Sequence, residues 1–181
     1  MSQWTLILML GISGLGCTEV AHPPAHPESS KSRPDQEIWG WTAALTRGGR
    51  RRAVVKAGHF QKYDRSPKME LDEGVTVIFY DSSGKVRVSQ LTAQRAEIDD
   101  KTNDMVVFGQ VVLLAEDSTR LETDTLKWSR QSGGISGEGR VTVYRPDGVE
   151  TGVGFEASSD LKRWTMHQVI TRLGQPDSLR P

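Results

Sequence analysis

The sequence has little cysteine, no excess of either charge and no long apolar run, and each shortage excludes a class of protein. Among 181 residues there is one cysteine, Cys17, which excludes an internal disulfide framework and a cysteine-rich zinc site. The 23 Lys and Arg balance the 23 Asp and Glu, so there is no basic excess for a nucleic-acid partner. No apolar run reaches the ~20 residues of a transmembrane helix. What remains is enough apolar sequence for one packed domain with short appendages.

The first residues have the pattern of an export signal. Residues 4–16, WTLILMLGISGLG, are uncharged, apolar and end in small residues, which is typical of a signal-peptide core. We therefore expect residues 1–16 to be a signal peptide, with Cys17 at the position that a lipoprotein signal gives to its lipidated residue. An ordinary cleaved signal, or a buried helix with a chance cysteine, stays open. Both signal interpretations send the protein across the inner membrane. Lipidation of Cys17 would anchor it to a membrane, for which we expect the inner one, while the outer membrane stays open.

Residues 17–49 are expected to be the lipidated cysteine followed by a tether. The segment 18–37 holds four of the eight prolines and almost nothing to bury, and its 20 residues reach at most ~60 Å at ~3.1 Å per residue. His22 and His26 have a metal-like spacing, but the prolines between and around them prevent a shared helix face, so we expect no metal site. Glu37–Arg47 is the one short helix candidate, and Gly40 weakens it.

Residues 50–172 are expected to form an all-β domain, and residues 173–181 a disordered tail. From about Arg50 onward, apolar and polar residues alternate in runs bounded by Gly, Asp and Ser, which indicates antiparallel strands. Asp147-Gly148 and Ser82-Ser83-Gly84 are typical of hairpin turns. His59 and His167 stand alone in strand-like surroundings, where solvated or cross-strand roles are expected.

The strands repeat with an offset of 30 residues. This shift pairs Leu91 with Leu121, Ala93 with Thr123, Ala96 with Leu126, Ile98 with Trp128, Gly109 with Gly139, Val111 with Val141, Leu113 with Val143 and Asp117 with Asp147. The repeating unit is a strand, a polar turn, and a glycine followed by an alternating apolar strand. Such units cannot bury an apolar face alone, so the repeat predicts a stack of hairpin-like units.

Eight apolar residues are expected to line one inward surface: Val77, Phe79, Val111, Leu113, Leu126, Trp128, Val141 and Val143. Two sheets that face each other across such residues enclose either a filled core or an open apolar groove, and the sequence leaves both open. There is no His-Glu-x-x-His, no Gly-x-Ser-x-Gly and no phosphate-binding glycine loop before a helix. We therefore expect neither an enzyme nor a cofactor.

Five blocks of sequence carry a family resemblance: Tyr80-Asp81 with Gly84, Leu91-Thr92-Ala93 with Ala96, Gly109 to Leu113, Leu121 to Trp128, and Gly152 to Leu161. Their order and spacing, from about Arg52 to Ile170, resemble the LptC family. The resemblance implies antiparallel strands in two facing sheets, a V-shaped half-open jelly roll whose apolar interior holds acyl chains. It also implies a non-enzymatic periplasmic protein that receives lipopolysaccharide from an inner-membrane ABC transporter and passes it to a β-stack bridge protein. Many members use a transmembrane helix as anchor, where this chain has a short lipoprotein-like signal.

The end of the β domain is expected to dock the bridge protein, through Gly152, Phe155 and Val169. The resemblance suggests that Gly152 lies near the joining end, although a glycine that merely permits a turn is equally open. The run from Arg47 to Arg52 is the one basic cluster, and it either meets lipid phosphates or the transporter, or lies in a solvated loop. The alternative function is an envelope lipoprotein with a filled β-sandwich in a structural or adhesion role.

Overall fold

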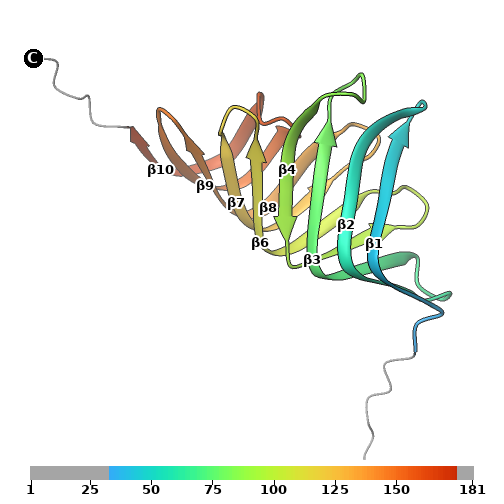
Figure 1. Ribbon diagram of the computed structural model, residues 1–181. Coiled ribbons are helices and arrows are strands. Elements are labelled where there is room, and N and C mark those ends of the chain that lie inside the picture. The colour runs from blue at the N-terminus through green and yellow to red at the C-terminus, as the bar shows by residue number, and fades with distance from the viewer. Residues whose placement is uncertain (1–32, 175–181) are drawn as a thin grey trace, which may run out of the picture. The chain divides into compact units, whose positions relative to one another are not determined.

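The computed structural model describes residues 33–174, and all regular structure within that range is β-strand (Figure 1). The strands are β1 Gln36–Arg47, β2 Arg50–Lys62, β3 Lys68–Tyr80, β4 Arg87–Ala93, β5 Arg95–Asp99, β6 Met105–Ala115, β7 Arg120–Trp128, β8 Gly134–Arg145, β9 Gly148–Ser158 and β10 Trp164–Gly174. The expected all-β antiparallel fold is confirmed. In this part of the chain, no helix with the length and apolar character of a membrane span is found.

The strands form one sheet rather than two. Its order is β1-β2-β3-β4-β6-β7-β8-β9-β10, every pairing is antiparallel, and β5 lies off this path between β3 and β6. The expected two facing sheets of a V-shaped half-open jelly roll are not confirmed, because all ten strands belong to one continuous sheet. Nearly every strand pairs with its sequence neighbour, because short turns such as Pro146-Asp147 favour hairpins. The sheet has two edges, at β1 and β10.

Bulges bend the long strands in the middle. On β6, Gly109 and Gln110 lie opposite the single residue Asp124, and on β8, Glu138 and Gly139 lie opposite Gly154. An extra residue on one strand bends that strand and increases its twist. Gly109 has a φ of 77°, which a residue without a Cβ adopts at little cost. Since Gly109 and Gly139 were paired by the 30-residue repeat, the repeat marks successive bends of the sheet.

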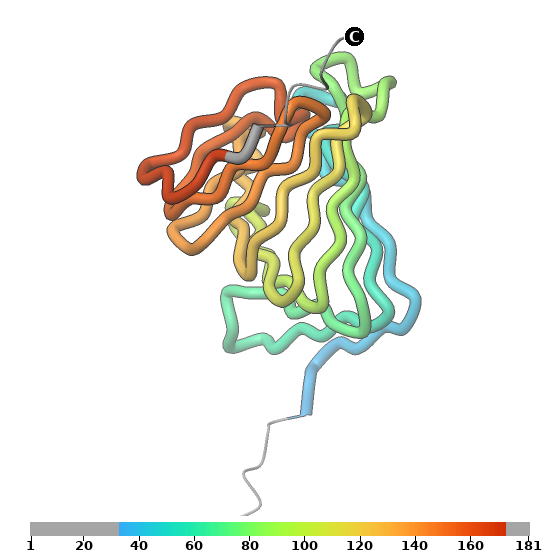
Figure 2. The backbone as a smooth tube through the Cα atoms, turned by 90° about the vertical axis from the view of Figure 1, so that its left-hand side faces the viewer, coloured from blue at the N-terminus to red at the C-terminus, as the bar shows by residue number. Residues whose placement is uncertain are grey.

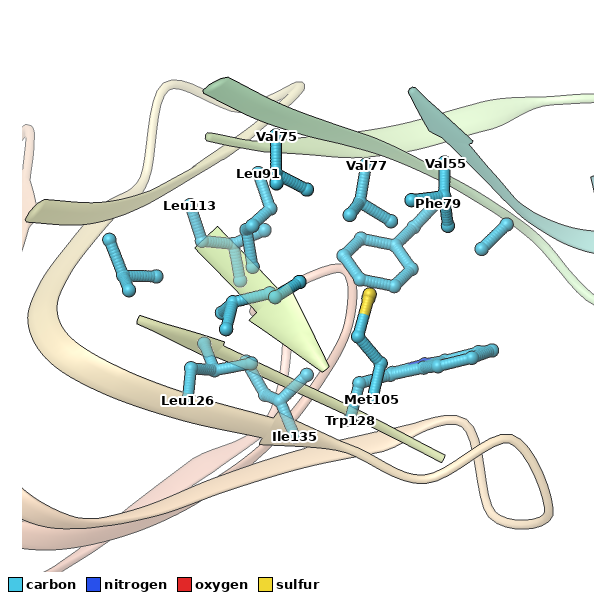
Figure 3. Close-up of a cluster of buried hydrophobic side chains, with 14 of the residues drawn as sticks. Val55, Val75, Val77, Phe79, Leu91, Met105, Leu113, Leu126, Trp128 and Ile135 are labelled. Carbon is cyan, nitrogen blue, oxygen red and sulfur yellow. The ribbon is translucent and has the colours of Figure 1, made fainter. Parts of the chain in front are cut away.

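The bends divide the sheet into two arms. The first arm contains residues 41–47, 50–57, 75–80, 87–93, 111–115, 120–123, 141–145, 148–153 and 168–174. The second arm contains residues 36–39, 59–62, 68–72, 95–99, 105–108, 125–128, 134–137, 155–158 and 164–166. Side chains from the two arms point toward one another across a shared core (Figure 3). Figure 2 shows strands β8 to β10 curling away from the direction of β1 to β4.

The prediction of a helix over Glu37–Arg47 is wrong. Residues 36–47 form β1, which pairs with β2 along its length, and its partly buried residues alternate at Trp41, Ala43 and Leu45. That alternation places one side of β1 on the core, and a helix would lose this contact. The β domain thus begins at Gln36 rather than at residue 50, and it ends at Gly174 rather than at 172.

Residues 1–32 and 175–181 lie outside the described part of the chain. The signal peptide, lipidation of Cys17, most of the tether and the disordered tail therefore stay predictions.

Candidate functional site

One row of inward side chains crosses the sheet from β1 to β8. Directly opposed residues on neighbouring antiparallel strands point to the same face. The register places the following residues side by side in the first arm: Ala43, Val55, Val77, Leu91, Leu113, Leu121 and Val143. From Val55 to Val143, each is at most 2% exposed. The first arm therefore carries an uninterrupted apolar stripe perpendicular to its strands.

The second arm carries a matching row. Its members, again in order of pairing, are Met69, Ile98, Met105, Trp128, Ile135, Ala157 and Trp164. Phe79 and Trp128 join the arms, with ring centroids 5.7 Å apart (Figure 3). The two rows thus face each other and form one interior.

All eight residues expected to line the inward surface lie in this interior, and none is more than 2% exposed. Leu126 and Trp128 come from the second arm, and the other six come from the first. Their own side chains fill the space between the arms. Whether these residues also contact lipid is a separate matter, because burial is equally required of a structural core.

Polar contacts close the interior along the mouth, where the ends of the arms opposite the bends meet. The hydroxyl of Ser89 on β4 donates to the carbonyl of Ser159, which follows β9. Nε of Arg130 donates to the carbonyl of Thr46 at 3.0 Å, and Arg47 donates to the carbonyl of Gln131. These contacts link strand ends of the first arm to turns that follow strands of the second arm. Hydrogen bonds of this kind contribute about 1 kcal/mol each.

The two edge strands expose apolar side chains. Trp39 on β1 is 63% exposed and Ile38 is 44% exposed, while Val169 and Ile170 on β10 are 41% and 48% exposed. An edge strand also presents unpaired N–H and C=O groups, to which another strand can add. Both ends of the sheet are therefore suited to extension by a second β-structure.

Two of the three expected docking residues lie one strand inside the edge. Gly152 and Phe155 are on β9, which β10 covers, and Phe155 is buried in the core. Only Val169 lies on the edge strand, opposite Gly152. A Cβ at Gly152 would stand 2.5 Å from both the Gln168 carbonyl oxygen and the Met166 sulfur. Gly152 is thus needed for close approach of β10, and it lies within strand β9 rather than in a turn.

His59 links three strands at the β1 edge. Its Nε2 lies 2.9 Å from Glu37 on β1, and its Nδ1 lies 2.8 Å from Asp72 on β3. Burial lowers the pKa of His59, but the hydrogen bonds and charges of both carboxylates outweigh it, so the pKa is raised above its ordinary value. The expected cross-strand role is confirmed for His59. Within residues 33–174 no cluster of three His, Cys, Asp or Glu side chains is placed to hold a metal.

Sequence reasoning missed a charged group at the end of the apolar row. Beyond Val143 the next two positions in the row are Glu150 on β9 and Arg172 on β10. These two side chains form an ion pair, with Glu150 Oε1 2.7 Å from Arg172 Nε. Glu150 is only 8% exposed. The sequence does contain a signal for Glu150. Val143 and Glu150 are equally far from the hairpin turn Pro146-Asp147, so they are expected to lie opposite each other on the same face.

A single antiparallel sheet, folded over one apolar interior and extendable at both edges, defines a β-stack domain. Over residues 5–173 the chain matches the family described as lipopolysaccharide-assembly, LptC-related, and it belongs to that family. The resemblance found from the sequence is confirmed. Membership makes the protein a component of lipopolysaccharide transport, associated with the periplasm and the cell envelope. No curated protein matches the chain.

Proposed function

We propose that the protein is a non-enzymatic conduit that holds the acyl chains of lipopolysaccharide between its two arms. The observation that carries the proposal is the apolar row from Ala43 to Val143, which runs across the sheet and faces a second apolar row. Acyl chains need many aliphatic contacts and no reactive group, and the interior supplies this. The eight inward residues, Phe79 and Leu113 among them, are the proposed lipid contacts.

Lipid would enter by separating the arms. About ten buried methylene groups would contribute on the order of 8 kcal/mol, whereas each polar contact at the mouth contributes about 1 kcal/mol. Most of the free energy needed to open the arms is therefore spent on separating the two apolar rows. The arriving acyl chains offset it by making new contacts with the same side chains. Ser89–Ser159 and Arg130–Thr46 are the contacts that break first in this scheme, because they lie at the mouth.

The two edges give the conduit a direction. Lipopolysaccharide would arrive from an inner-membrane ABC transporter, with the chain held nearby through lipidated Cys17. It would leave at β10, where a periplasmic β-stack bridge protein adds a strand and continues the interior. Exposed Val169 supports docking at this edge, and Gly152 acts indirectly by letting β10 lie close to β9. Because the interior continues into the partner, the acyl chains never cross water.

Photocrosslinking in cells tests the conduit. A photoreactive residue at Leu113, which is fully buried, should trap lipopolysaccharide, while the same residue at neighbouring Leu114, which is 48% exposed, should not. Both variants must keep the melting temperature of the wild-type protein. Absence of a lipid adduct at position 113, and likewise at Phe79 and Val143, would reject the conduit.

The filled interior favours a second candidate, an envelope lipoprotein with a structural or adhesion role. The buried side chains and the polar contacts at the mouth are what such a protein also requires. This candidate predicts that no inward position yields lipid adducts, so the same crosslinking experiment decides between the two.

A further inference from the structure

The inward face changes from apolar to charged at its β10 end. Glu150 and Arg172 continue the row that runs from Ala43 to Val143, and Arg145, two residues beyond Val143, lies on the same face. The Arg145 guanidinium stacks over the ring of Trp164, 5.3 Å from its centroid, and Trp164 ends the row of the second arm. The end of the interior is thus lined by two guanidiniums, one carboxylate and an indole.

The carboxylate has an acceptor that nothing in residues 33–174 satisfies. Oε1 of Glu150 forms an ion pair with Arg172 Nε, 2.7 Å away, and lies 3.9 Å from Arg145 Nη2, while Oε2 is buried and has no hydrogen-bond partner among the described residues. A buried acceptor left unpaired destabilises the folded protein. Such a cost is tolerated where a ligand supplies the missing donor.

We propose that Arg145, Glu150 and Arg172 form a binding site for a phosphorylated sugar, the polar end of a glycolipid whose acyl chains occupy the apolar rows. Guanidiniums present forked N–H donors that match phosphate oxygens, and a sugar hydroxyl is the donor that Glu150 Oε2 lacks. Trp164 gives the sugar a flat apolar surface. This inference rests on the proposed function and assigns its lipid a fixed orientation, with the headgroup toward β10.

The charges at the site agree with an anionic ligand. The inward face carries the positive side chains of Arg145 and Arg172 and the buried negative side chain of Glu150, so its net charge is positive. Asp147 also contacts Arg145, at 3.3 Å, but it lies on the turn between β8 and β9 rather than on the inward face, and solvent screens it as it screens Arg172. Arg172 is 68% exposed, so it is free to turn from Glu150 toward an arriving phosphate while remaining at the edge.

Titration with water-soluble probes tests the site without acyl chains. The indole N–H signal of Trp164 in an NMR spectrum should shift saturably with glucosamine 1-phosphate, more weakly with inorganic phosphate, and not with glucosamine. Arg145→Gln and Arg172→Gln should each weaken binding of glucosamine 1-phosphate about tenfold, because each removes a charged hydrogen-bond donor. Glu150→Gln should abolish the preference for glucosamine 1-phosphate over inorganic phosphate.

Arg120→Gln is the matched control, since Arg120 stacks over Tyr144 on the outward face. It should leave the Trp164 titration unchanged. Any of three results would overturn the site. The Trp164 signal does not respond, the protein binds inorganic phosphate and the sugar phosphate equally, or Arg120→Gln and Arg145→Gln have the same effect in variants with wild-type melting curves. If a lipid adduct forms at Leu113 but the sugar phosphate does not bind, the conduit stands and only this inference is rejected. If the sugar phosphate binds but no adduct forms, the site stands and the conduit is rejected.

Discussion

Phe79 and Trp128 pack against each other from opposite arms, with centroids 5.7 Å apart and ring planes inclined by 48°. Each is at most 1% exposed. They are 49 residues apart in sequence, so their contact depends on the bends that fold the sheet over itself. Tilted aromatic pairs contribute about 0.5–1.5 kcal/mol beyond the area that they bury.

Truncating one member of this pair should destabilise the fold strongly. We expect Trp128→Ala to lower the free energy of unfolding by about 3–5 kcal/mol, because it leaves a large cavity between the arms. Trp39→Ala should cost less than about 1 kcal/mol, since Trp39 is 63% exposed. Urea denaturation followed by circular dichroism measures both. Similar losses in the two variants would show that the arms do not share a core at Trp128.

Removing the Ser89 hydroxyl should loosen the mouth. Ser89→Ala deletes the donor to the Ser159 carbonyl, and we expect a loss of about 0.5–1.5 kcal/mol in unfolding free energy. If lipid enters there, the same change should also speed uptake of a fluorescent lipopolysaccharide in a stopped-flow assay. Ser83→Ala, whose hydroxyl bonds Asp81 within one turn, is the control. Unchanged uptake in Ser89→Ala would argue that lipid enters elsewhere.

A side chain at Gly152 should displace the edge strand. Gly152→Ala places a Cβ against the Gln168 carbonyl and the Met166 sulfur, and overpacking of this kind costs about 1–3 kcal/mol. We expect faster amide exchange in β10 and weaker pull-down of the periplasmic bridge protein, and Gly152→Arg should show both effects more strongly. Gly139→Ala is the control, because a Cβ there meets no atom within 4 Å. Wild-type pull-down by Gly152→Arg would place the docking edge elsewhere.

Stability should fall as the pH rises through the titration of His59. A raised folded pKa means that His59 binds its proton more tightly in the folded protein. Its contribution is therefore fully present below the unfolded pKa of about 6.5 and is lost as the pH rises through the folded pKa. Melting temperatures measured from pH 5.5 upward should show this decline, and His59→Gln should flatten it. His167→Gln, at a histidine that lies outside the Glu37–His59–Asp72 contacts, is the control. A wild-type slope in His59→Gln would contradict the assignment.

The anchor prediction follows from the sequence alone. If Cys17 is lipidated, Cys17→Ser should abolish metabolic labelling with a fatty acid and leave the signal segment uncleaved at this site. Equal labelling of the wild-type and Cys17→Ser proteins would reject the lipoprotein assignment.

The sequence by itself determined the strands from Arg50 onward and the inward side chains. Alternation at Val141 and Val143, or at Val111 and Leu113, specifies one face of a strand, because side chains point to opposite faces in turn. The sequence also predicted a hairpin turn at Asp147-Gly148, because turn preferences are local, and the turn lies one residue earlier, at Pro146-Asp147. The blocks that resemble the LptC family are also local patterns, and the family match confirms the recognition.

Only the tertiary structure decided how these faces meet. Residues 37–47 have no strong local preference, and pairing with β2 makes them a strand because that contact buries Trp41 and Leu45. Periodicity specifies a face of a strand but not the pairing register, so it could not show that Gly152 lies directly beside Val169 of β10. It could not place Glu150 beside Arg172 either, because that contact joins strands through the register of the sheet rather than through sequence spacing.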